Sequence, residues 1–223
     1  RIKNIVKLSK SKERKSQGLF IIEGARELSL ALCAEYAIDS VFLCAELFSK
    51  TEYPEVLDYI SKEKIYEVTE SVFEKIAYRE GSDGLLTLAK PNNHTLENLK
   101  LSKNPFIIIL EAVEKPGNLG AILRTADAAQ ADAVIVCDPA TDLYNPNVIR
   151  SSVGCLFTVQ TAACTSQQAL EYLKHKPSIT NQKAQELCVF NKNQTYYILH
   201  QMCKDGILQP DGVGRGTKYK SVK

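Results

Sequence analysis

The sequence predicts an α/β fold divided among several units. Its 223 residues exceed the roughly 100–200 residues of one typical domain, so we expect more than one. Over residues 1–90, short apolar runs alternate with apolar residues at helical spacing, which is typical of a small α/β domain. A second strand–helix–strand pattern follows a polar stretch, and the pattern changes again after Pro177. The expected units are a domain at 1–90, a linker at 91–105, a second domain at 106–176 and a third at 177–223.

Strand and helix patterns alternate through the first domain. Uninterrupted apolar runs predict strands, and apolar residues three or four apart predict helices. Strands are expected at 20–22, 40–43, 65–68 and 85–88, and helices around Leu28 and around Val56. In the second domain, strands are expected at 106–110, 133–137 and 156–161, and helices at 118–129 and 148–154.

Composition and charge narrow the class of protein without deciding its partner. With 44% hydrophobic and 24% charged residues, the chain is typical of a globular protein. The net charge is only +2, but the first fifteen residues are strongly basic and contain the single acidic residue Glu13. A solvated face and a nucleic-acid contact are about equally compatible with this charge. The basic residues are Arg1, Lys3, Lys7, Lys10, Lys12, Arg14 and Lys15.

The cysteines and histidines form no pattern typical of a metal or redox site. No cysteine lies at metal-ligand or redox spacing from another, so we expect free thiols in a reducing cytoplasm and no metal. The isolated His94, His175 and His200 are expected on the surface. No membrane-spanning run or targeting signal is evident, so we expect a cytoplasmic protein without a membrane partner. The cysteines are Cys33, Cys44, Cys137, Cys155, Cys164, Cys188 and Cys203.

The helix expected at 118–129 carries the first candidate site residues. Asn118 is of the residue type that caps helices, and Gly120 and Arg124 are four apart and therefore share a face. A ligand could approach the backbone at Gly120 beside a guanidinium, which binds phosphate or carboxylate through paired hydrogen bonds. The preceding strand ends where open α/β sheets bind their ligands. The alternative is an ordinary turn with Arg124 on the surface.

Three segments resemble the SpoU/TrmH family of RNA ribose 2′-O-methyltransferases, which belong to the knotted SPOUT superfamily. Residues 111–136 resemble the family's motif one and residues 142–157 resemble its motif two. Residues 14–26 resemble its substrate-binding domain, and the whole resemblance covers about residues 1–175. It implies S-adenosylmethionine as methyl donor, rRNA or tRNA as substrate, and a homodimer.

The resemblance also implies roles for individual residues. Arg124 would act on the ribose 2′-hydroxyl, and Asn118 would fix the site beside it. Because a guanidinium stays protonated, positioning the hydroxyl and stabilising the developing alkoxide is a less demanding role than acting as base. A surface arginine at 150 and a packed serine at 152 remain alternatives. The implied pocket residues are Glu111, Gly120, Arg150, Ser152 and Gly154, and the implied RNA contacts are Arg14 and Arg26.

The family's third motif, a Gly-rich loop, an Ile-Pro strand end and a Ser-Leu-Asn turn, is missing after Lys174. In the family this motif wraps the cofactor, threads the knot and contributes to the dimer, so we expect a methyltransferase domain without its C-terminal knot segment. The alternative function is a catalytically incomplete nucleic-acid-binding protein.

Residues 177–223 instead resemble a winged helix-turn-helix. Thr180 is expected to cap a first helix, a second helix is expected at 192–204, and residues 206–208 and 217–220 are expected to form a two-stranded wing. In such motifs the second helix enters the DNA major groove, although winged helices also bind proteins. The candidate DNA contacts are Lys192, Asn193, Gln194, Tyr197, Arg215 and Lys218.

Overall fold

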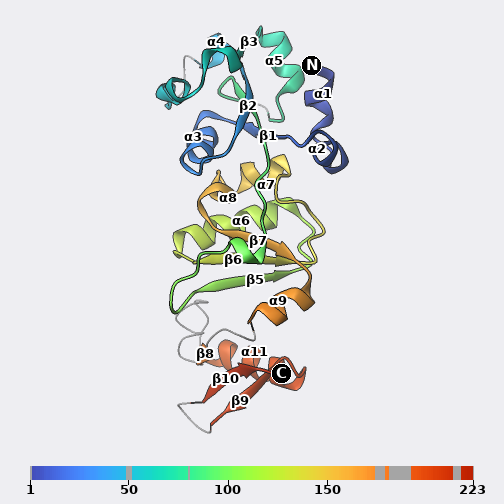
Figure 1. The fold of residues 1–223 in the computed structure, drawn as a ribbon, viewed down its shortest axis with the longest axis vertical. Helices are drawn as coiled ribbons and strands as arrows, with labels where there is room; N and C mark the ends of the chain where they lie inside the picture. The colour runs from blue at the N-terminus through green and yellow to red at the C-terminus, as the bar shows by residue number, and fades with distance from the viewer. Residues whose placement is uncertain are drawn as a thin grey trace.

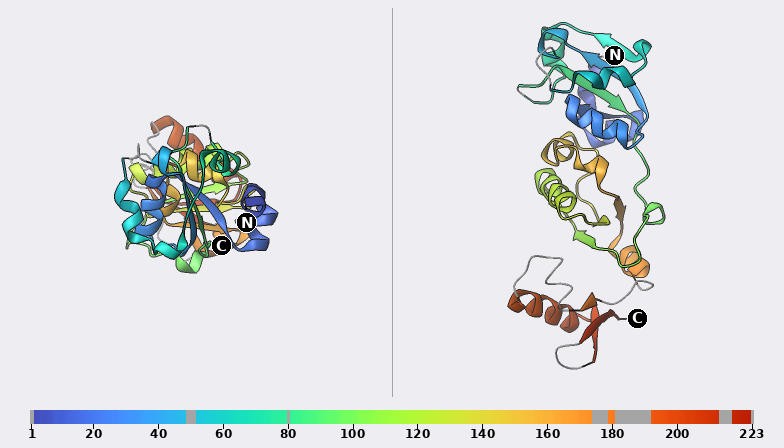
Figure 2. Two further views of the ribbon diagram at one scale, coloured as in Figure 1. Left: turned by 90° about the horizontal axis from the view of Figure 1, so that it is seen from above. Right: turned by 90° about the vertical axis from the view of Figure 1, so that its left-hand side faces the viewer.

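The computed structural model describes residues 2–48, 52–79, 81–173, 179–180, 192–212 and 217–222. The chain forms an N-terminal α/β unit, a second α/β unit and a small C-terminal unit, which follow one another along the longest axis of the molecule (Figures 1 and 2). No helix among the described residues is long and apolar enough to cross a membrane.

The N-terminal unit is built on a four-stranded sheet of order β1-β4-β2-β3. Its pairs are antiparallel except for β2 and β3, which are parallel. All four expected strands are confirmed, whereas the residues around Val56 form a 3-10 helix. The elements are α1 (Ile2–Lys7), α2 (Ser11–Gln17), β1 (Phe20–Glu23), α3 (Ala25–Cys33), β2 (Ile38–Leu43), α4 (Ala45–Phe48), 3-10 helices Pro54–Tyr59 and Lys62–Lys64, β3 (Ile65–Glu67), α5 (Glu70–Ile76) and β4 (Leu85–Ala89).

The second unit contains a three-stranded parallel sheet of order β5-β6-β7. The strands expected at 106–110 and 133–137 and the helix expected at 118–129 are confirmed, with ends shifted by up to two residues. The elements are the 3-10 helix Leu96–Asn98, β5 (Ile107–Glu111), α6 (Pro116–Ala128), β6 (Ala133–Cys137), α7 (Pro146–Ser151), α8 (Cys155–Thr158), β7 (Thr161–Cys164) and α9 (Ser166–Leu173).

The strand expected at 156–161 is wrong. Residues Cys155–Thr158 form the short helix α8, which follows Gly154 at a φ of +81°. This left-handed backbone, which glycine adopts without strain, turns the chain so that Leu156 and Phe157 are both buried. A strand would have pointed these neighbouring side chains to opposite faces. Strand β7 starts only at Thr161.

The stretch between the two sheets packs against the second one. Leu96 is buried with Ile135 and Ala162, and the backbone N–H of Ala163 donates to the carbonyl of His94 at 2.9 Å. The expectation that His94 is an ordinary surface residue is wrong, because its ring Nε2 lies 2.8 Å from the Tyr144 hydroxyl. Its other ring nitrogen lies 2.6 Å from the hydroxyl of Thr161. His200 is exposed, and His175 lies outside the described residues.

One hydrophobic core joins the first two units. Phe20 and Leu28 of the N-terminal unit belong to the same buried cluster as Leu123 and Phe157 of the second unit. The ring centroids of Phe20 and Tyr144 are 4.2 Å apart across this boundary. Apolar burial of this kind is the dominant stabilising term in folded domains, so it holds the two sheets in a fixed relation.

The C-terminal unit contains a three-stranded antiparallel sheet and one described helix. The helix expected at 192–204 and the strand expected at 217–220 are confirmed, the latter shifted by one residue, whereas the strand expected at 206–208 starts only at Leu208 and runs to Asp211. Thr180 ends β8, and the helix that it was expected to cap, through Ala184 and Leu187, lies outside the described residues. The elements are β8 (Ile179–Thr180), α11 (Lys192–Lys204), β9 (Leu208–Asp211) and β10 (Lys218–Ser221), with the order β8-β10-β9.

The six described cysteines are free thiols, and Cys188 lies outside the described residues. Cys137 and Cys164 are register partners on β6 and β7. Burial raises the pKa of the Cys137 thiol to about 11, which keeps it protonated and unreactive. Within the described parts of the chain, no group of three metal-ligating side chains is placed to hold an ion.

Candidate active site

The carboxyl ends of β5, β6 and β7 form one polar edge, because parallel strands end on the same side of a sheet. Glu111 ends β5 and Asp138 follows β6, and the Ser166 hydroxyl lies 3.0 Å from Glu111 Oε1 and 2.6 Å from Asp138 Oδ2. Hydrogen bonds from Ser166 lower the pKa of Asp138. Glu111 was expected in the pocket, whereas Asp138 and Ser166 were not, although Asp138 directly follows β6 and Ser166 follows the turn after β7.

The helix α6 begins earlier than expected. Its cap is Lys115 and its first residue is Pro116, whose fixed φ and missing N–H suit the first helical position. Asn118 therefore lies in the first turn, where its backbone N–H donates to the Lys115 carbonyl at 3.0 Å. The expectation that Asn118 caps the helix is wrong, and its side chain is exposed.

Gly120 is buried, and the space beside it is filled by helix α7. A Cβ atom at this position would overlap the Ser151 hydroxyl and lie 2.7 Å from the Ser152 backbone nitrogen. The sequence predicted space for a ligand beside Gly120, but Ser151 and Ser152 of the protein itself occupy this space. Gly120 brings the helices of motif one and motif two into direct contact.

Arg124 lies on the exposed side of α6, one turn beyond Gly120. It makes no hydrogen bond or ion pair with another described residue. Nearby, Asp127 accepts a hydrogen bond of 2.6 Å from the Thr158 hydroxyl, which ties the end of α6 to α8. The guanidinium of Arg124 is thus available to an anionic or hydroxyl-bearing ligand.

Helix α7 carries the motif-two residues in different environments. The Asn145 side chain caps the helix by accepting the Asn147 N–H at 2.9 Å. Arg150 is exposed, whereas Ser152 is fully buried and donates to the Ile149 carbonyl at 3.0 Å. Of the two interpretations of Ser152, its environment matches the packed serine.

Gly154 faces the N-terminal unit and not the polar edge. A Cβ atom there would lie 2.7 Å from the Leu30 side chain of α3, so this glycine permits close packing between the units. Arg150 and Arg79 line the same small hollow, in which Arg79 Nε lies 3.6 Å from Glu23 Oε1. Burial raises the pKa of Glu23 above its ordinary value.

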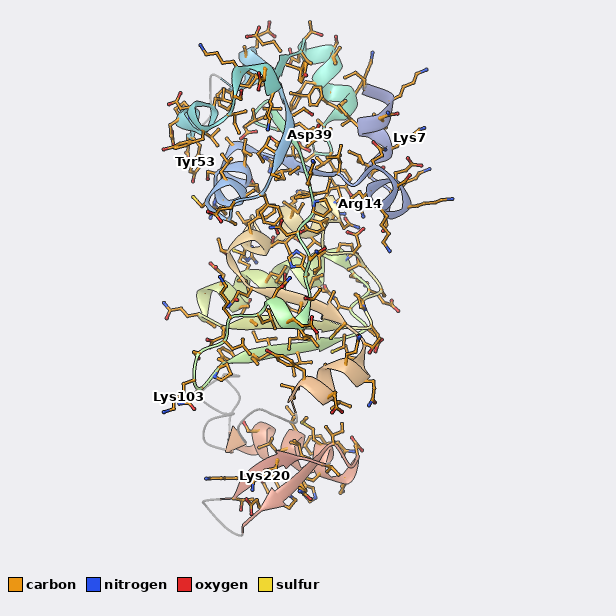
Figure 3. The ribbon with its side chains drawn as sticks, viewed as in Figure 1. Lys7, Arg14, Asp39, Tyr53, Lys103 and Lys220 are labelled. Carbon is orange, nitrogen blue, oxygen red and sulfur yellow. The ribbon has the colours of Figure 1, made fainter. Side chains whose placement is uncertain are left out.

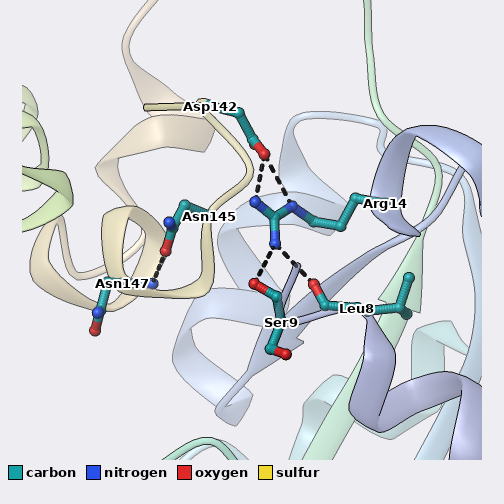
Figure 4. A network of polar contacts seen from close by, with 6 residues as sticks. All are labelled: Leu8, Ser9, Arg14, Asp142, Asn145 and Asn147. Carbon is teal, nitrogen blue, oxygen red and sulfur yellow. Dashed lines mark hydrogen bonds and ion pairs between the residues drawn. The ribbon is translucent and has the colours of Figure 1, made fainter. Parts of the chain in front are cut away.

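The two arginines expected to contact RNA also differ in exposure. Arg26 is exposed on α3, but the Arg14 side chain is only 5% exposed. All three guanidinium nitrogens of Arg14 are engaged inside the protein: they bind Asp142 and the carbonyls of Leu8 and Ser9 (Figure 4). The geometry does not support an RNA contact for Arg14, because no nitrogen of its guanidinium is left for one.

Two family models match the chain. Residues 1–87 match the MRM3-like substrate binding domain, and residues 105–199 match the SpoU rRNA Methylase family. The second α/β unit therefore contains a domain of the SpoU rRNA methylase family.

Similar known proteins are longer than this chain. The protein is 30% identical to the 23S rRNA (guanosine(2553)-2′-O)-methyltransferase RlmP of Bacillus subtilis over 71% of this chain and 60% of that protein. It is 38% identical to a solved RNA 2′-O ribose methyltransferase, with a TM-score of 0.67 over 78% of this chain and 66% of that chain. An AdoMet-bound rRNA methyltransferase from Sinorhizobium meliloti, 23% identical, shares the fold with a TM-score of 0.69 over 80% and 66% of the two chains. The chain thus spans less than two thirds of the length of the Bacillus relative.

Proposed function

We propose that this protein transfers a methyl group from S-adenosylmethionine to a ribose 2′-hydroxyl of rRNA or tRNA. The observation that carries the proposal is the exposed guanidinium of Arg124 on α6, the helix that follows the carboxyl end of β5 in a SpoU-family domain. The Bacillus relative is by name a 23S rRNA 2′-O-methyltransferase, which supports the same substrate class.

Arg124 acts in this proposal through its charge and its hydrogen bonds. Its guanidinium stays protonated at neutral pH and can only donate. It holds the ribose hydroxyl in place and stabilises the negative charge that develops on the oxygen as the proton leaves. Asn118, exposed on α6, and Arg150, exposed on α7, help to hold the RNA.

The proposed RNA surface of the N-terminal unit consists of the exposed lysines of α1, α2 and the turn between these helices. Its lysines are exposed and form no ion pair with another described residue. Free lysines on one face bind phosphates, and their affinity falls steeply with salt as counterions are released. We call this set the lysine face: Lys3, Lys7, Lys10, Lys12 and Lys15.

The described residues do not by themselves fit S-adenosylmethionine. Ligands of this size are enclosed over most of their surface, but Glu111 and Asp138 at the polar edge are exposed. A cavity of about 210 Å³ lies beside Gln160 and Thr161 at the amino end of β7, away from that edge. We therefore infer that this chain, whose sequence shows no third motif, supplies the ribose end of the site and binds the methyl donor weakly.

Methyl transfer to purified rRNA and tRNA tests the proposal. With radiolabelled S-adenosylmethionine at millimolar concentration, we expect slow transfer that falls about a hundredfold in Arg124→Ala, as for the loss of an oxyanion donor. The matched control is Lys103→Ala, an exposed residue before β5, which should keep the wild-type rate. No transfer by the wild-type chain, or equal loss in both variants, would refute the proposal.

A second function is supported by the C-terminal unit. We propose that residues 177–223 form a winged helix that contacts duplex DNA through α11, because the strand order β8-β10-β9 places a hairpin beside this helix. Tyr197 on α11 is 70% exposed, and Lys218 starts β10. Of the other candidate contacts, Arg215 and the side chains of Lys192, Asn193 and Gln194 lie outside the described residues.

Binding of the full chain to labelled duplex DNA separates this function from the first. Tyr197→Ala should weaken binding severalfold, while Tyr59→Ala, an equally exposed tyrosine of the N-terminal unit, should not. Binding that neither variant changes would exclude α11 as the DNA contact.

We also propose a homodimer, which sedimentation velocity would show as twice the mass of one chain.

A further inference from the structure

Arg14 connects segments 128 positions apart in the sequence. Its Nε donates to Asp142 Oδ2 at 3.1 Å, and a second nitrogen forms an ion pair with the same oxygen. Its third nitrogen donates to the carbonyls of Leu8 at 2.7 Å and Ser9 at 2.9 Å. The Arg14 side chain, which comes from α2, thus connects the end of α1 with the loop that leads into motif two (Figure 4).

Asp142 stands at the start of a chain of contacts that leads to α7. Its carbonyl accepts the Asn145 N–H at 3.0 Å, and the Asn145 side chain caps α7. Helix α7 then packs its Ser151 against Gly120 of α6, one turn before Arg124. The position of Asp142 is therefore linked through these contacts to the helix that carries Arg124.

The same helices that Arg14 holds carry the lysine face. Lys7 extends outward from α1, whereas Arg14 lies inward at the boundary between the two units (Figure 3). Ile5 and Leu8 anchor α1 to the N-terminal unit through a second hydrophobic cluster, which does not include residues of the second unit. The link from α1 and α2 to the motif-two loop is thus made by the Arg14 guanidinium.

We propose that Arg14 is a positioning residue that fixes the lysine face relative to motif two, so that RNA bound there presents its ribose at Arg124. This inference rests on the proposed function. Arg14 itself does not touch RNA, because its side chain is buried and every one of its guanidinium nitrogens is engaged. Its partner Asp142 is 24% exposed, so removal of the guanidinium leaves a largely buried carboxylate without its counter-charge.

Hydrogen exchange measured by mass spectrometry on the full chain tests the link in both directions, without methyl transfer. In Arg14→Gln, we expect amide exchange in residues 138–150 to rise about tenfold, because a partly buried pair is broken. In Asp142→Asn, which keeps the shape of the side chain and the Arg14 bonds to Leu8 and Ser9, exchange should rise in residues 8–18. If exchange in Arg14→Gln rises only near residues 2–18, Arg14 stabilises α1 and α2 alone, and the inference is overturned.

RNA binding and methyl transfer form the second arm of the test. Arg14→Gln should keep the RNA affinity within about twofold, and the rate of transfer at saturating RNA should fall about tenfold, because the ribose is misplaced. The matched control Lys12→Gln, on the same helix, should weaken RNA binding and lower its salt dependence while the saturating rate is retained. Equal loss of RNA affinity in both variants would show that Arg14 is an ordinary RNA contact and would refute the inference.

The two arms separate the failure of this inference from that of the proposed function. If the wild-type chain transfers no methyl group, the proposed function fails, and the exchange pattern still decides whether Arg14 couples the two segments. If Arg14→Gln does not fold, Asp142→Asn carries the exchange test alone. Unchanged exchange in residues 8–18 of that variant would then overturn the inference.

Discussion

Gly120 is the residue at which the helices of motif one and motif two touch. The sequence indicated a space for a ligand at this position, but the Ser151 side chain and the Ser152 backbone occupy it. A glycine pattern alone shows that something approaches the backbone closely, and it does not show whether that neighbour is a ligand or another helix.

Substitution of Gly120 by alanine tests this contact. Gly120→Ala should lower the free energy of unfolding by about 1–3 kcal/mol, because overpacking forces α7 away from α6. Gly117→Ala is the matched control, since a Cβ atom at Gly117 meets no other atom within 4 Å. Gly117→Ala should raise stability by a few tenths to about 1 kcal/mol, as alanine does in a helix. Urea unfolding of the three proteins measures the differences, and equal stability of both variants would contradict the packing described.

His94 is predicted to make stability depend on pH. Burial lowers the pKa of its imidazole below the ordinary value. Over the pH range between the two pKa values, the imidazole is therefore protonated in the unfolded chain and neutral in the folded chain. The stability that His94 contributes is therefore present above its unfolded pKa near 6.5 and is lost as the pH falls toward the folded value. We expect the loss of stability between pH 7.5 and pH 5.5 to be smaller in His94→Gln than in the wild type. Denaturation at both pH values gives this difference, and an unchanged pH dependence in the variant would contradict it.

At the scale of elements, helix α9 begins with a capping box that the sequence reasoning overlooked. The Thr165 hydroxyl accepts the Gln168 N–H at 3.2 Å, and the Gln168 side chain accepts the Thr165 N–H at 2.8 Å. The spacing of threonine and glutamine three residues apart is a sequence signal for this arrangement. The cap orients Ser166 toward Glu111 and Asp138.

Thr165→Ala should therefore weaken α9. Loss of a cap of this kind costs about 0.5–2 kcal/mol, and amide exchange in residues 166–173 should rise while exchange in β6 stays unchanged. Gln167→Ala alters an exposed neighbour that takes no part in the cap and serves as control. Equal exchange of α9 in both variants would show that the capping box does not stabilise the helix.

Regular elements were predictable from the sequence where local pattern decided them. The apolar run that forms the buried strand β6 predicted the bounds of that strand correctly. The bounds predicted for helix α11 also agree with the observed ones. The pattern failed where tertiary contacts decide the conformation, as at Leu156 and Phe157, where a left-handed Gly154 starts a helix in place of a strand. The burial of Arg14 against Asp142 could not be predicted from the sequence either, because no local pattern pairs residues 128 positions apart.

At the scale of the whole molecule, the shared core predicts that the first two units unfold together. Leu123 is fully buried in a cluster that includes Phe20 and Leu28. Leu123→Ala should lower the free energy of unfolding by about 2–5 kcal/mol. The midpoint of urea unfolding should then fall equally for peptides of the first sheet and for peptides of the second sheet. Leu199→Ala, at a buried position of α11, should leave both midpoints unchanged. Separate transitions of the two sheets in Leu123→Ala would contradict a common core.

The central claim is that RNA lies across the lysine face and the exposed side of α6. Photocrosslinking of the full chain to 4-thiouridine-labelled rRNA or tRNA, with the crosslinked peptides identified by mass spectrometry, tests it most directly. We predict crosslinks in residues 2–17 and 116–128, which fall together as salt is raised because phosphate contacts dominate the affinity. Crosslinks confined to residues 192–222 would contradict the claim and would make the C-terminal unit the nucleic-acid-binding part of this protein.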